Sequence, residues 1–313
     1  MAGSIPVVVI QGPTAVGKTG LAIEIACALN GEIVNADSRQ VYRFMNIGTA
    51  KPTPAQQSLV PHHLIDIVNP DETLTLTEYQ AAAEAAIMDI HSRKRLPLLV
   101  GGTGQYITGL LEGWRVPDVP PNPLLRAELE AFAAEYGPAA LHTRLQDLDP
   151  VAADEIDYRN VRRVVRALEV CLESGQPFSE QTRRLPPPYH LWQCGLTMNR
   201  ERLYERADRR LDNMLAQGFV EEVKWLLEMG YNASLPAMSA LGYVQLATYL
   251  LGECTLDEAN TATRRATRDF IRRQYTWFRG HDKGILWFDS ETTDPNTLIE
   301  LIATWQAQET QAG

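Results

Sequence analysis

The segment from Gly12 to Thr19 restricts the fold of this chain more than any other part of the sequence. It reads GPTAVGKT and fits the pattern G-x-x-x-x-G-K-[S/T]. It directly follows the apolar run Val7 to Ile10 and precedes an amphipathic helical pattern over Leu21 to Leu29. A strand, a glycine-rich turn and a helix in this order form a phosphate-binding loop within an α/β sheet. The segment therefore predicts both a fold class and an anion site.

The spaced glycines of this loop allow backbone N–H groups to surround an anion, and the helix N-terminus adds partial positive charge. We expect Lys18 to reach the outer phosphate and Thr19 to offer its hydroxyl to Mg²⁺. A glycine turn that arose by chance is the alternative. The loop indicates a diphosphate without indicating which molecule carries it. The residues expected to bind this diphosphate are Gly12, Pro13, Thr14, Ala15, Val16, Gly17, Lys18 and Thr19.

Short apolar runs alternate with helical patterns along the first third of the chain. The runs Ile33 to Val34 and Leu96 to Val100 are typical of buried strands, and Tyr79 to Ile90 has a helical pattern. Strands that alternate with helices form parallel sheets. We therefore expect an α/β fold, with a parallel sheet of the P-loop nucleoside-triphosphatase type flanked by helices.

Two proline clusters divide the rest of the chain. Residues 114–123 contain four prolines in ten residues (WRVPDVPPNP), and residues 184–190 read RLPPPYH. Proline stops helices and strands, so such clusters are typical of linkers. The pattern between them is helical. The sequence thus predicts an inserted all-helical domain at residues 116–190, between two parts of a catalytic core at residues 1–115 and 191–313, the second of which includes a basic C-terminal helix.

Composition narrows the class of protein. The formal net charge is −10, which argues against uniform coating of nucleic acid while allowing a local basic face. The four cysteines have no CxxC spacing, so neither a zinc site nor a disulfide framework is indicated. No apolar stretch reaches membrane length and no signal segment is apparent. We expect a monomeric cytoplasmic protein.

Polar side chains follow two of the predicted strands. Asp37 to Gln40 stand at the carboxyl end of the second strand, where ligands sit in open parallel sheets. Asp37 suits a metal ligand, a general base or the N-cap of a following helix. The strand at Leu96 to Val100 ends in Gly101-Gly102-Thr103-Gly104, where nucleotide hydrolases place a metal-binding carboxylate. Thr103 is expected to face the same cleft, with a plain glycine-rich turn as the alternative.

Nine sequence blocks together resemble the bacterial tRNA dimethylallyltransferases of the IPP transferase family, and they cover nearly the full length of the chain. The blocks of the first third are GPTAVGKT, NADSRQVY (35–42), GTAKPT (48–53), HHLIDIV (62–68) and LVGGTGQY (99–106). The later blocks are DYRNVRRVVRALEV (157–170), ADRRLDNML (207–215), LGY (241–243) and RRQYTWFR (272–279).

This resemblance implies the transfer of a dimethylallyl group from dimethylallyl diphosphate, with Mg²⁺ as cofactor. The acceptor would be N6 of the adenosine next to the anticodon (A37), in tRNAs that read codons beginning with U, and diphosphate would be released. Asp37 matches the family's proposed base and Thr103 its hydroxyl partner. Lys18 and Arg210 match the leaving-group cations, although neighbouring Arg209 could exchange roles with Arg210. The segment that receives the flipped base is matched by Ser38, Arg39 and Gln40.

Two helical stretches carry arginines at helical spacing, and we expect both to bind tRNA phosphates and together to clamp a duplex stem. Charged faces that are only solvated are the alternative. The first face consists of Arg159, Arg162, Arg163 and Arg166, and the second of Arg265, Arg268, Arg272 and Arg279. Further tRNA contacts are expected at Asp37, Thr103, Arg126, Asn160, Gly242 and Tyr243.

Other functions compete with this interpretation. The same fold could prenylate free AMP, ADP or ATP, act as a small-molecule P-loop kinase, or bind RNA under nucleotide control without catalysis. A motor or GTPase is disfavoured because no NKxD-like motif is present. His62 and His63 lack spaced acidic or thiol partners, so a structural or capping role is favoured over metal ligation. The inserted domain and the arginine faces favour tRNA as the acceptor.

Overall fold

The computed structural model describes residues 4–182, 184–281 and 284–312. The chain forms two compact units, a core unit of Met1–Leu111 with Pro188–Gly313 and an inserted unit of Glu112–Pro187. These limits lie close to residues 116 and 190, which the proline clusters indicate. In the part of the chain that the structure describes, no helix is both long and apolar enough to cross a membrane.

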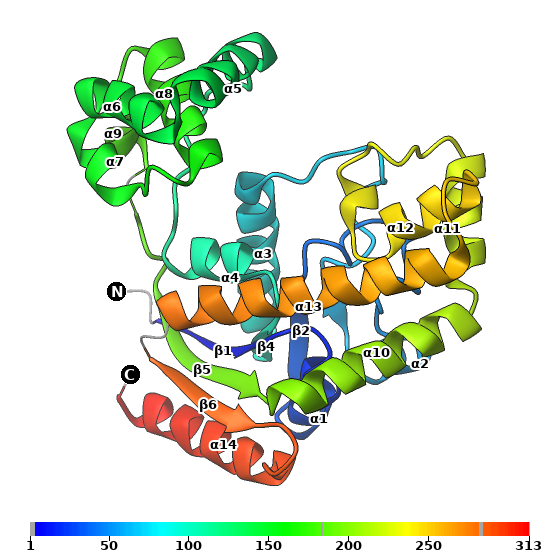
Figure 1. Cartoon of the computed structure of the whole chain (residues 1–313). Helices are drawn as coiled ribbons and strands as arrows, with labels where there is room; N and C mark the ends of the chain where they lie inside the picture. Colours follow the sequence, from blue (N-terminus) through cyan, green and yellow to red (C-terminus); the bar gives the residue numbers. More distant parts are fainter. Residues whose placement is uncertain (1–3, 183, 282–283, 313) are drawn as a thin grey trace. The chain divides into compact units, whose positions relative to one another are not determined.

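One parallel sheet forms the centre of the core unit (Figure 1). Its strand order is β3-β2-β4-β1-β5-β6. In β1, Val9 pairs with Leu99 of β4 on one side and with Gln193 of β5 on the other, so the strand that leads into the phosphate loop is central. The bounds are β1 Ile5–Gln11, β2 Gly31–Ala36, β3 His62–His63, β4 Leu96–Gly101, β5 Tyr189–Thr197 and β6 Ile285–Asp289.

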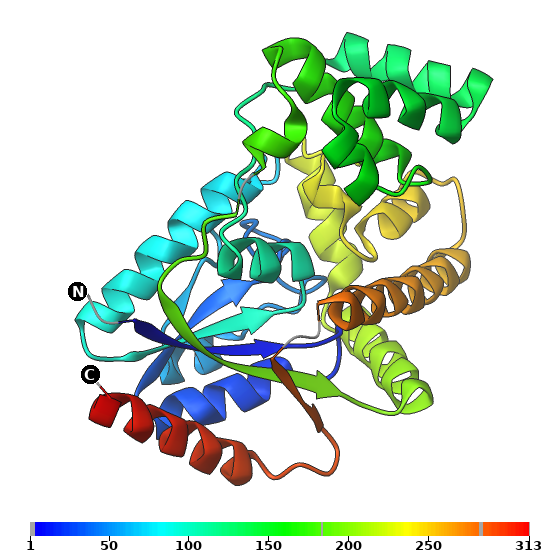
Figure 2. The same cartoon turned by 90° about the vertical axis from the view of Figure 1, so that its left-hand side faces the viewer.

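Helices cover both faces of this sheet, which explains why its central strands are continuous apolar runs. The first face packs against α1 (Lys18–Ala28) and α14 (Pro295–Ala312), and the opposite face against α3 (Leu76–Ser92) and α4 (Gly104–Leu111) (Figure 2). The short helix α2 (Pro54–Leu59) follows the turns after β2. The parallel sheet with helices on both faces confirms the predicted fold class.

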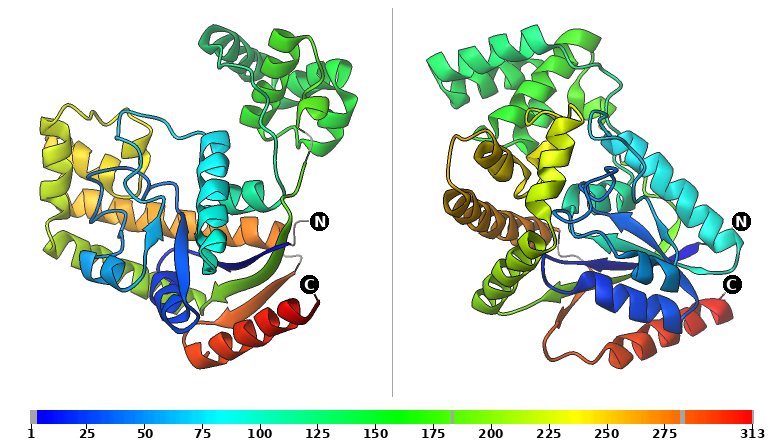
Figure 3. Two further views of the ribbon diagram at one scale, coloured as in Figure 1. Left: turned by 180° about the vertical axis from the view of Figure 1, so that it is seen from behind. Right: turned by 90° about the vertical axis from the view of Figure 1, so that its right-hand side faces the viewer.

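A helical lobe of the core unit has a separate hydrophobic core. Phe219 and Tyr243 are fully buried there, together with Met45 from the segment after β2. Within this lobe α10 and α13 pack side by side, as Figures 1 and 3 show. The lobe comprises α10 (Arg200–Ala216), α11 (Phe219–Glu228), the 3₁₀ helix η1 (Ala237–Ser239), α12 (Tyr243–Leu250) and α13 (Leu256–Gly280).

The helices of the core unit begin at the residues that capping chemistry favours. Thr53, Thr75 and Thr255 each accept a hydrogen bond from the N–H three residues on, where a Gln or Glu side chain bonds back. Such reciprocal capping satisfies two backbone groups at a helix start. It fixes the start of α13, the longest helix of the described chain at 25 residues.

The inserted unit is all-helical, as predicted, and has its own core. Leu141, Leu145, Val164 and Leu168 are among its buried side chains. Its two ends lie side by side, because the Leu185 N–H donates to the Gly113 carbonyl at 3.0 Å. Its helices are α5 (Pro123–Tyr136), α6 (Pro138–Leu148), α7 (Pro150–Glu155), α8 (Val161–Ser174) and α9 (Phe178–Gln181).

Candidate active site

Two cavities open from the carboxyl ends of the strands in the core unit. The larger, of about 730 Å³, extends along the phosphate loop and the start of α10. The smaller, of about 200 Å³, lies against α10, α11 and the segment after η1. We call them the loop cavity and the lobe cavity. Five residues line both cavities, so the two meet at this point: Thr14, Ala15, Asp37, Arg210 and Phe270.

The phosphate loop connects the end of β1 to the first turn of α1. Gly12 has φ 148°, and a Cβ added there would lie 2.6 Å from the Leu196 carbonyl oxygen, so only glycine fits. Ala15 also adopts a left-handed conformation, with φ 64°. Lys18 folds over the loop and its Nζ donates to the Gly12 and Pro13 carbonyls at 2.9 and 2.7 Å. The ammonium group is therefore held at the loop.

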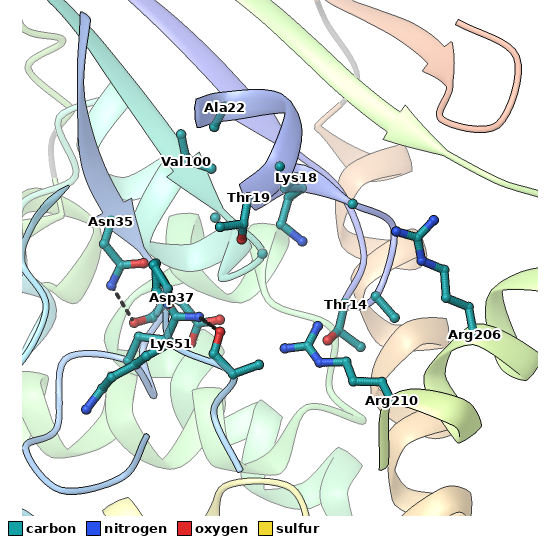
Figure 4. A pocket seen from close by; sticks show the side chains of 18 of the residues that line it. Thr14, Lys18, Thr19, Ala22, Asn35, Asp37, Lys51, Val100, Arg206 and Arg210 are labelled. Carbon is teal, nitrogen blue, oxygen red and sulfur yellow. Dashed lines mark hydrogen bonds between the residues drawn. The ribbon is translucent and has the colours of Figure 1, made fainter. Parts of the chain in front are cut away.

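Arginines of α10 face the loop from the other side. Arg210 and Arg206 point toward Thr14 and Lys18 in Figure 4. Among the described residues, no carboxylate forms an ion pair with either arginine. Arg206 lies four residues before Arg210, on the same helix face. Sequence reasoning missed Arg206, which the i, i+4 spacing could have indicated.

Burial and the neighbouring charges shift the pKa values of these cations. Burial lowers the pKa of Lys18 to about 8, Asp37 opposes this shift and Arg210 reinforces it. Burial also lowers the pKa of Arg210, with Asp37 raising it and Arg206 lowering it. Positive charges crowded in a low-dielectric site destabilise one another. A bound anion would relieve this repulsion.

Asp37 stands opposite the arginines, at the end of β2. Its Oδ1 accepts the Arg39 N–H at 2.8 Å, which fixes the carboxylate within a turn. The interpretation of Asp37 as a helix N-cap is wrong, because turns follow it and the next helix begins at Pro54. The carboxylate faces the junction of the two cavities, where it can act as a base or reach a metal ion.

Thr103 reaches this junction through Ser38. Its Oγ1 accepts the Ser38 N–H at 3.0 Å and donates to Ser38 Oγ at 3.3 Å. Thr103 itself is not among the described residues that line either cavity. Of the expected segment after Asp37, Arg39 lines the lobe cavity and Gln40 the loop cavity, whereas Ser38 is not among the described residues that line either one.

The wall of the lobe cavity is anchored by a residue that sequence reasoning missed. Glu222 of α11 accepts the N–H groups of Asn46, Ile47 and Gly48 at 2.8, 2.8 and 3.2 Å, and the Tyr243 hydroxyl at 2.6 Å. Consecutive backbone N–H groups that converge on one anion form a nest. The nest precedes Thr49, which lines the lobe cavity with Gly48.

Tyr243 requires a correction. It was expected to contact tRNA, but its side chain is fully buried and its hydroxyl is bound to Glu222. The preceding Gly242 has φ 88° and is the N-cap of α12. Gly242 and Tyr243 therefore serve the packing of the helical lobe, because a tyrosine ring at 0% exposure cannot reach an external ligand.

The arginines predicted as the first tRNA-binding face are only partly free to bind phosphates. Glu169 is fully buried and binds Arg126 at 2.7 Å and Arg166 at 2.6 Å. Burial opposes its ionisation, but these arginines and the Asn122 N–H bring the Glu169 pKa down to about 2. Two members of the predicted tRNA-binding set thus neutralise a buried carboxylate of the unit itself, and removal of either would leave that charge less well paired.

The other predicted tRNA-binding residues of the inserted unit fall into two groups, those with partners within the unit and those without a carboxylate partner among the described residues. Arg159 is exposed but pairs with Asp157 at 2.5 Å, and Asn160 caps α8 by accepting the Arg163 N–H. Among the described residues of the unit, Arg162 and Arg163 have no carboxylate partner. They are the two arginines of the stripe that remain available to an external anion.

The arginines of α13 lie partly in a surface groove of about 370 Å³. Arg268 pairs with Asp208 of α10 at 2.5 Å, and Arg272 pairs with Asp269. Arg265 lines the same groove and, within the described part of the chain, pairs with no carboxylate. Arg279 is exposed further along the helix. The predicted second arginine face thus exists, with two of its members paired.

The two adjacent histidines have structural partners. His63 Nε2 lies 2.7 Å from Oε2 of the buried Glu32, which also binds Arg93 and Arg95. His62 Nδ1 lies 2.8 Å from the Val60 carbonyl. The residues described include no group of three or more His, Cys, Asp or Glu side chains arranged to hold a metal. The contacts of His63 with Glu32 and of His62 with the Val60 carbonyl are of the structural kind that the sequence favours.

The sequence and fold match known proteins. The IPP transferase family model matches residues 40–281. A tRNA dimethylallyltransferase of Chloroflexus aurantiacus is 57% identical over 272 residues, which are 87% of this chain and 92% of that protein. One from a Roseiflexus species is 55% identical over 275 residues, or 88% of this chain and 90% of that protein.

Solved structures match as well. The tRNA isopentenylpyrophosphate transferase of Bacillus halodurans has a TM-score of 0.73 and 41% identity, and the match covers 98% of this chain and 97% of that one. A eukaryotic dimethylallyltransferase acting on tRNA has a TM-score of 0.81 and 27% identity, over 97% of this chain and 80% of that one.

Proposed function

The chain belongs to the IPP transferase family, and from this membership we propose that it transfers a dimethylallyl group to tRNA. The donor is dimethylallyl diphosphate, and the acceptor is N6 of the adenosine on the 3′ side of the anticodon (A37), in tRNAs that read codons beginning with U. The observation that carries this proposal is the junction of two cavities at Asp37 and Arg210. The loop cavity suits a diphosphate. The lobe cavity lies beside it, and the Asp37 carboxylate lines both.

The loop cavity supplies what an allylic diphosphate needs. Breaking the allylic C–O bond places negative charge on the departing diphosphate, so cations and N–H donors stabilise the transition state. Lys18, Arg206 and Arg210 converge on the phosphate loop without carboxylate partners among the described residues. Arg209 lines the same cavity, but its side chain is exposed. We therefore assign the leaving-group contact to Arg210, with Arg206 beside it.

The residues at the loop also fit Mg²⁺. Mg²⁺ takes one or two protein oxygens and completes its shell with waters and substrate phosphates. The Thr19 hydroxyl lines this cavity and would supply such a protein oxygen. When bound, the ion neutralises charge on the diphosphate oxygens.

The lobe cavity is the proposed site of the flipped adenine. A base stacked in an anticodon loop must leave the stack to reach an enclosed site. The exocyclic nitrogen then meets C1 of the donor beside Asp37, whose carboxylate accepts the proton as the N–C bond forms. Thr103 fixes the Ser38 backbone next to this carboxylate. Apolar side chains of the wall, Phe219 and Leu241 among them, exclude water from the base.

The exposed arginines are proposed to bind the tRNA backbone. Arg162 and Arg163 on the inserted unit and Arg265 on α13 have no carboxylate partner among the residues described, which leaves them available to phosphates. We propose that the protein acts as a monomer. Because its substrate is tRNA, we propose that it acts in the cytoplasm.

The function is tested with two acceptors. The protein is incubated with dimethylallyl diphosphate, Mg²⁺ and either an anticodon stem-loop with an adenosine at the 3′ side of the anticodon or free AMP. We expect a gain of one C5 unit on the stem-loop by mass spectrometry and none on AMP. Product from AMP alone would instead make the protein an adenylate prenyltransferase, and phosphate transfer from ATP without C5 transfer would make it a kinase.

A further inference from the structure

Gln274 of α13 joins the two loops that carry the candidate site. Its Oε1 accepts the Thr14 backbone N–H at 2.9 Å, and its Nε2 donates to the Gly102 carbonyl at 2.8 Å. The side chain is 6% exposed. A single buried amide therefore holds together the phosphate loop after β1 and the glycine-rich loop after β4.

Both partners of this amide adjoin reacting groups. Thr14 lines both cavities. Gly102 directly precedes Thr103, which orients Ser38 beside Asp37. A Cβ added at Gly102 would lie 2.6 Å from Gln274 Nε2, 3.2 Å from the Gly12 carbonyl oxygen and 3.5 Å from Lys18 Nζ. The amide thus lies where the diphosphate side and the base side of the site come closest.

We propose that Gln274 is a positioning residue that sets the spacing between the leaving-group cations and the acceptor side of the site. This inference rests on the proposed function. Replacement of the amide by a hydrocarbon leaves two backbone polar groups unpaired, so the loops shift until water or a new partner satisfies them. Rates of group transfer fall steeply with such shifts, by about 100-fold for a misplacement of about 1 Å.

The same helix presents Arg265 and Arg272 to the exterior from other faces. Gln274 therefore also links α13, whose exposed arginines are proposed to bind RNA, to the two loops that carry the proposed reaction site. Its contribution should appear in turnover and in donor binding, whereas RNA affinity depends on the arginines, which the amide does not contact.

The test compares Gln274→Met, which preserves length but removes both hydrogen bonds, with Gln308→Met on the exposed side of α14 as a matched control. With dimethylallyl diphosphate and the stem-loop, we expect kcat to fall by about 10- to 100-fold and KM for RNA to stay within about twofold. The control should be unaffected. An unchanged kcat in a folded Gln274→Met protein would overturn the proposal, as would a loss confined to KM for RNA.

A second variant makes the test independent of how well Gln274→Met folds. Gly102→Ala presses a methyl group against the amide, so it should slow turnover in the wild-type background. It should add little further loss in a Gln274→Ala background, where the side chain that it presses against has been removed. Fully additive losses, or a folded Gly102→Ala protein with normal kcat, would contradict a shared role.

Failure of the proposed function is distinguishable from failure of this inference. A wild-type protein that transfers no C5 unit refutes the function. The role of the Gln274 side chain is then tested by calorimetric titration with inorganic diphosphate. The Kd should be several-fold higher in Gln274→Met than in the control, because the displaced loops bind the anion less well. An equal Kd in the two variants would refute the proposed positioning role of Gln274.

Discussion

The hydroxyl of Thr103 accepts the backbone N–H of Ser38 at 3.0 Å, although the two residues follow different strands and are 65 positions apart in the chain. This bond fixes the turn that begins with Asp37. Thr103→Ser preserves the hydroxyl and should retain most of the activity, whereas Thr103→Val should lower kcat by about tenfold or more because the turn loses its anchor. Steady-state rates of the two folded variants decide the point, and equal rates would show that the hydroxyl has no role.

Asp37→Asn should leave RNA binding unchanged and lower kcat by about 10²- to 10⁴-fold, the usual contribution of a general base. The amide oxygen of asparagine can still accept the Arg39 N–H, so the turn is preserved. Gel-shift titration with the stem-loop and single-turnover rates measure the two effects separately. Loss of RNA affinity in parallel with turnover would indicate that Asp37 acts in base capture instead.

Three arginines of α10 should differ in their effect on the donor. Arg210→Gln should lower kcat/KM for dimethylallyl diphosphate by about 10²-fold, as expected when a group that stabilises developing negative charge is removed. Arg206→Gln should have a smaller effect in the same direction, because its side chain is more exposed. Arg209→Gln should have the smallest effect of the three, because Arg209 is exposed and, unlike Arg206, is not among the charges that shift the pKa of Arg210. A larger loss at Arg209 than at Arg210 would reverse the assignment.

The pKa of about 8 at Lys18 predicts an alkaline limit on donor capture. Above that pH, the free enzyme loses the ammonium charge that meets the diphosphate, so kcat/KM for the donor should fall as pH rises. Bound diphosphate favours the charged form, so kcat should hold to higher pH than kcat/KM. In Lys18→Arg the guanidinium keeps its charge, and the alkaline fall should disappear from whatever activity remains. A wild-type profile that is flat across pH 8 would contradict the prediction.

The arginines of α8 should separate into RNA-binding and structural members. Arg162→Ala with Arg163→Ala should weaken tRNA binding and reduce the slope of log K against log salt by roughly 1.4 to 1.8, since two phosphate contacts are lost. Arg166→Ala should mainly destabilise the inserted unit, because it leaves the buried Glu169 with one arginine fewer. Salt titrations and thermal unfolding measure these effects. An unchanged slope in the double variant would exclude this surface from the RNA interface.

Local features of the site could be predicted from sequence. The phosphate loop is a run of eight residues whose conformation follows from its own glycines and flanking elements, and Asp37 and Thr103 each follow a strand that its apolar run identifies. Parallel strands end at the same edge, which is why these residues meet. The two-residue strand β3 and the order of the sheet were not predicted, because two residues carry no periodic pattern.

Contacts between distant segments could not be predicted. Gln274 binds Thr14 across 260 positions, and Glu222 binds Ile47 across 175. Neither residue differs in local pattern from its helical neighbours. Helical spacing placed the arginines of α8 on one face, but it could not reveal that Glu169 is buried beneath two of the predicted residues. Tyr243 was misassigned for the same reason, since burial is a property of the assembled lobe.

The central place of β1 in the sheet has a consequence for how the protein is made. β1 needs β5 as a neighbour, and β5 begins at Tyr189, after the whole inserted unit has been synthesised. Arg210 and Gln274 follow later still. A nascent chain on the ribosome therefore carries the phosphate loop on a strand with one open edge, and the donor site is completed only near the end of translation. Early synthesis of the inserted unit lets it fold first, as an independent body within an unfinished sheet.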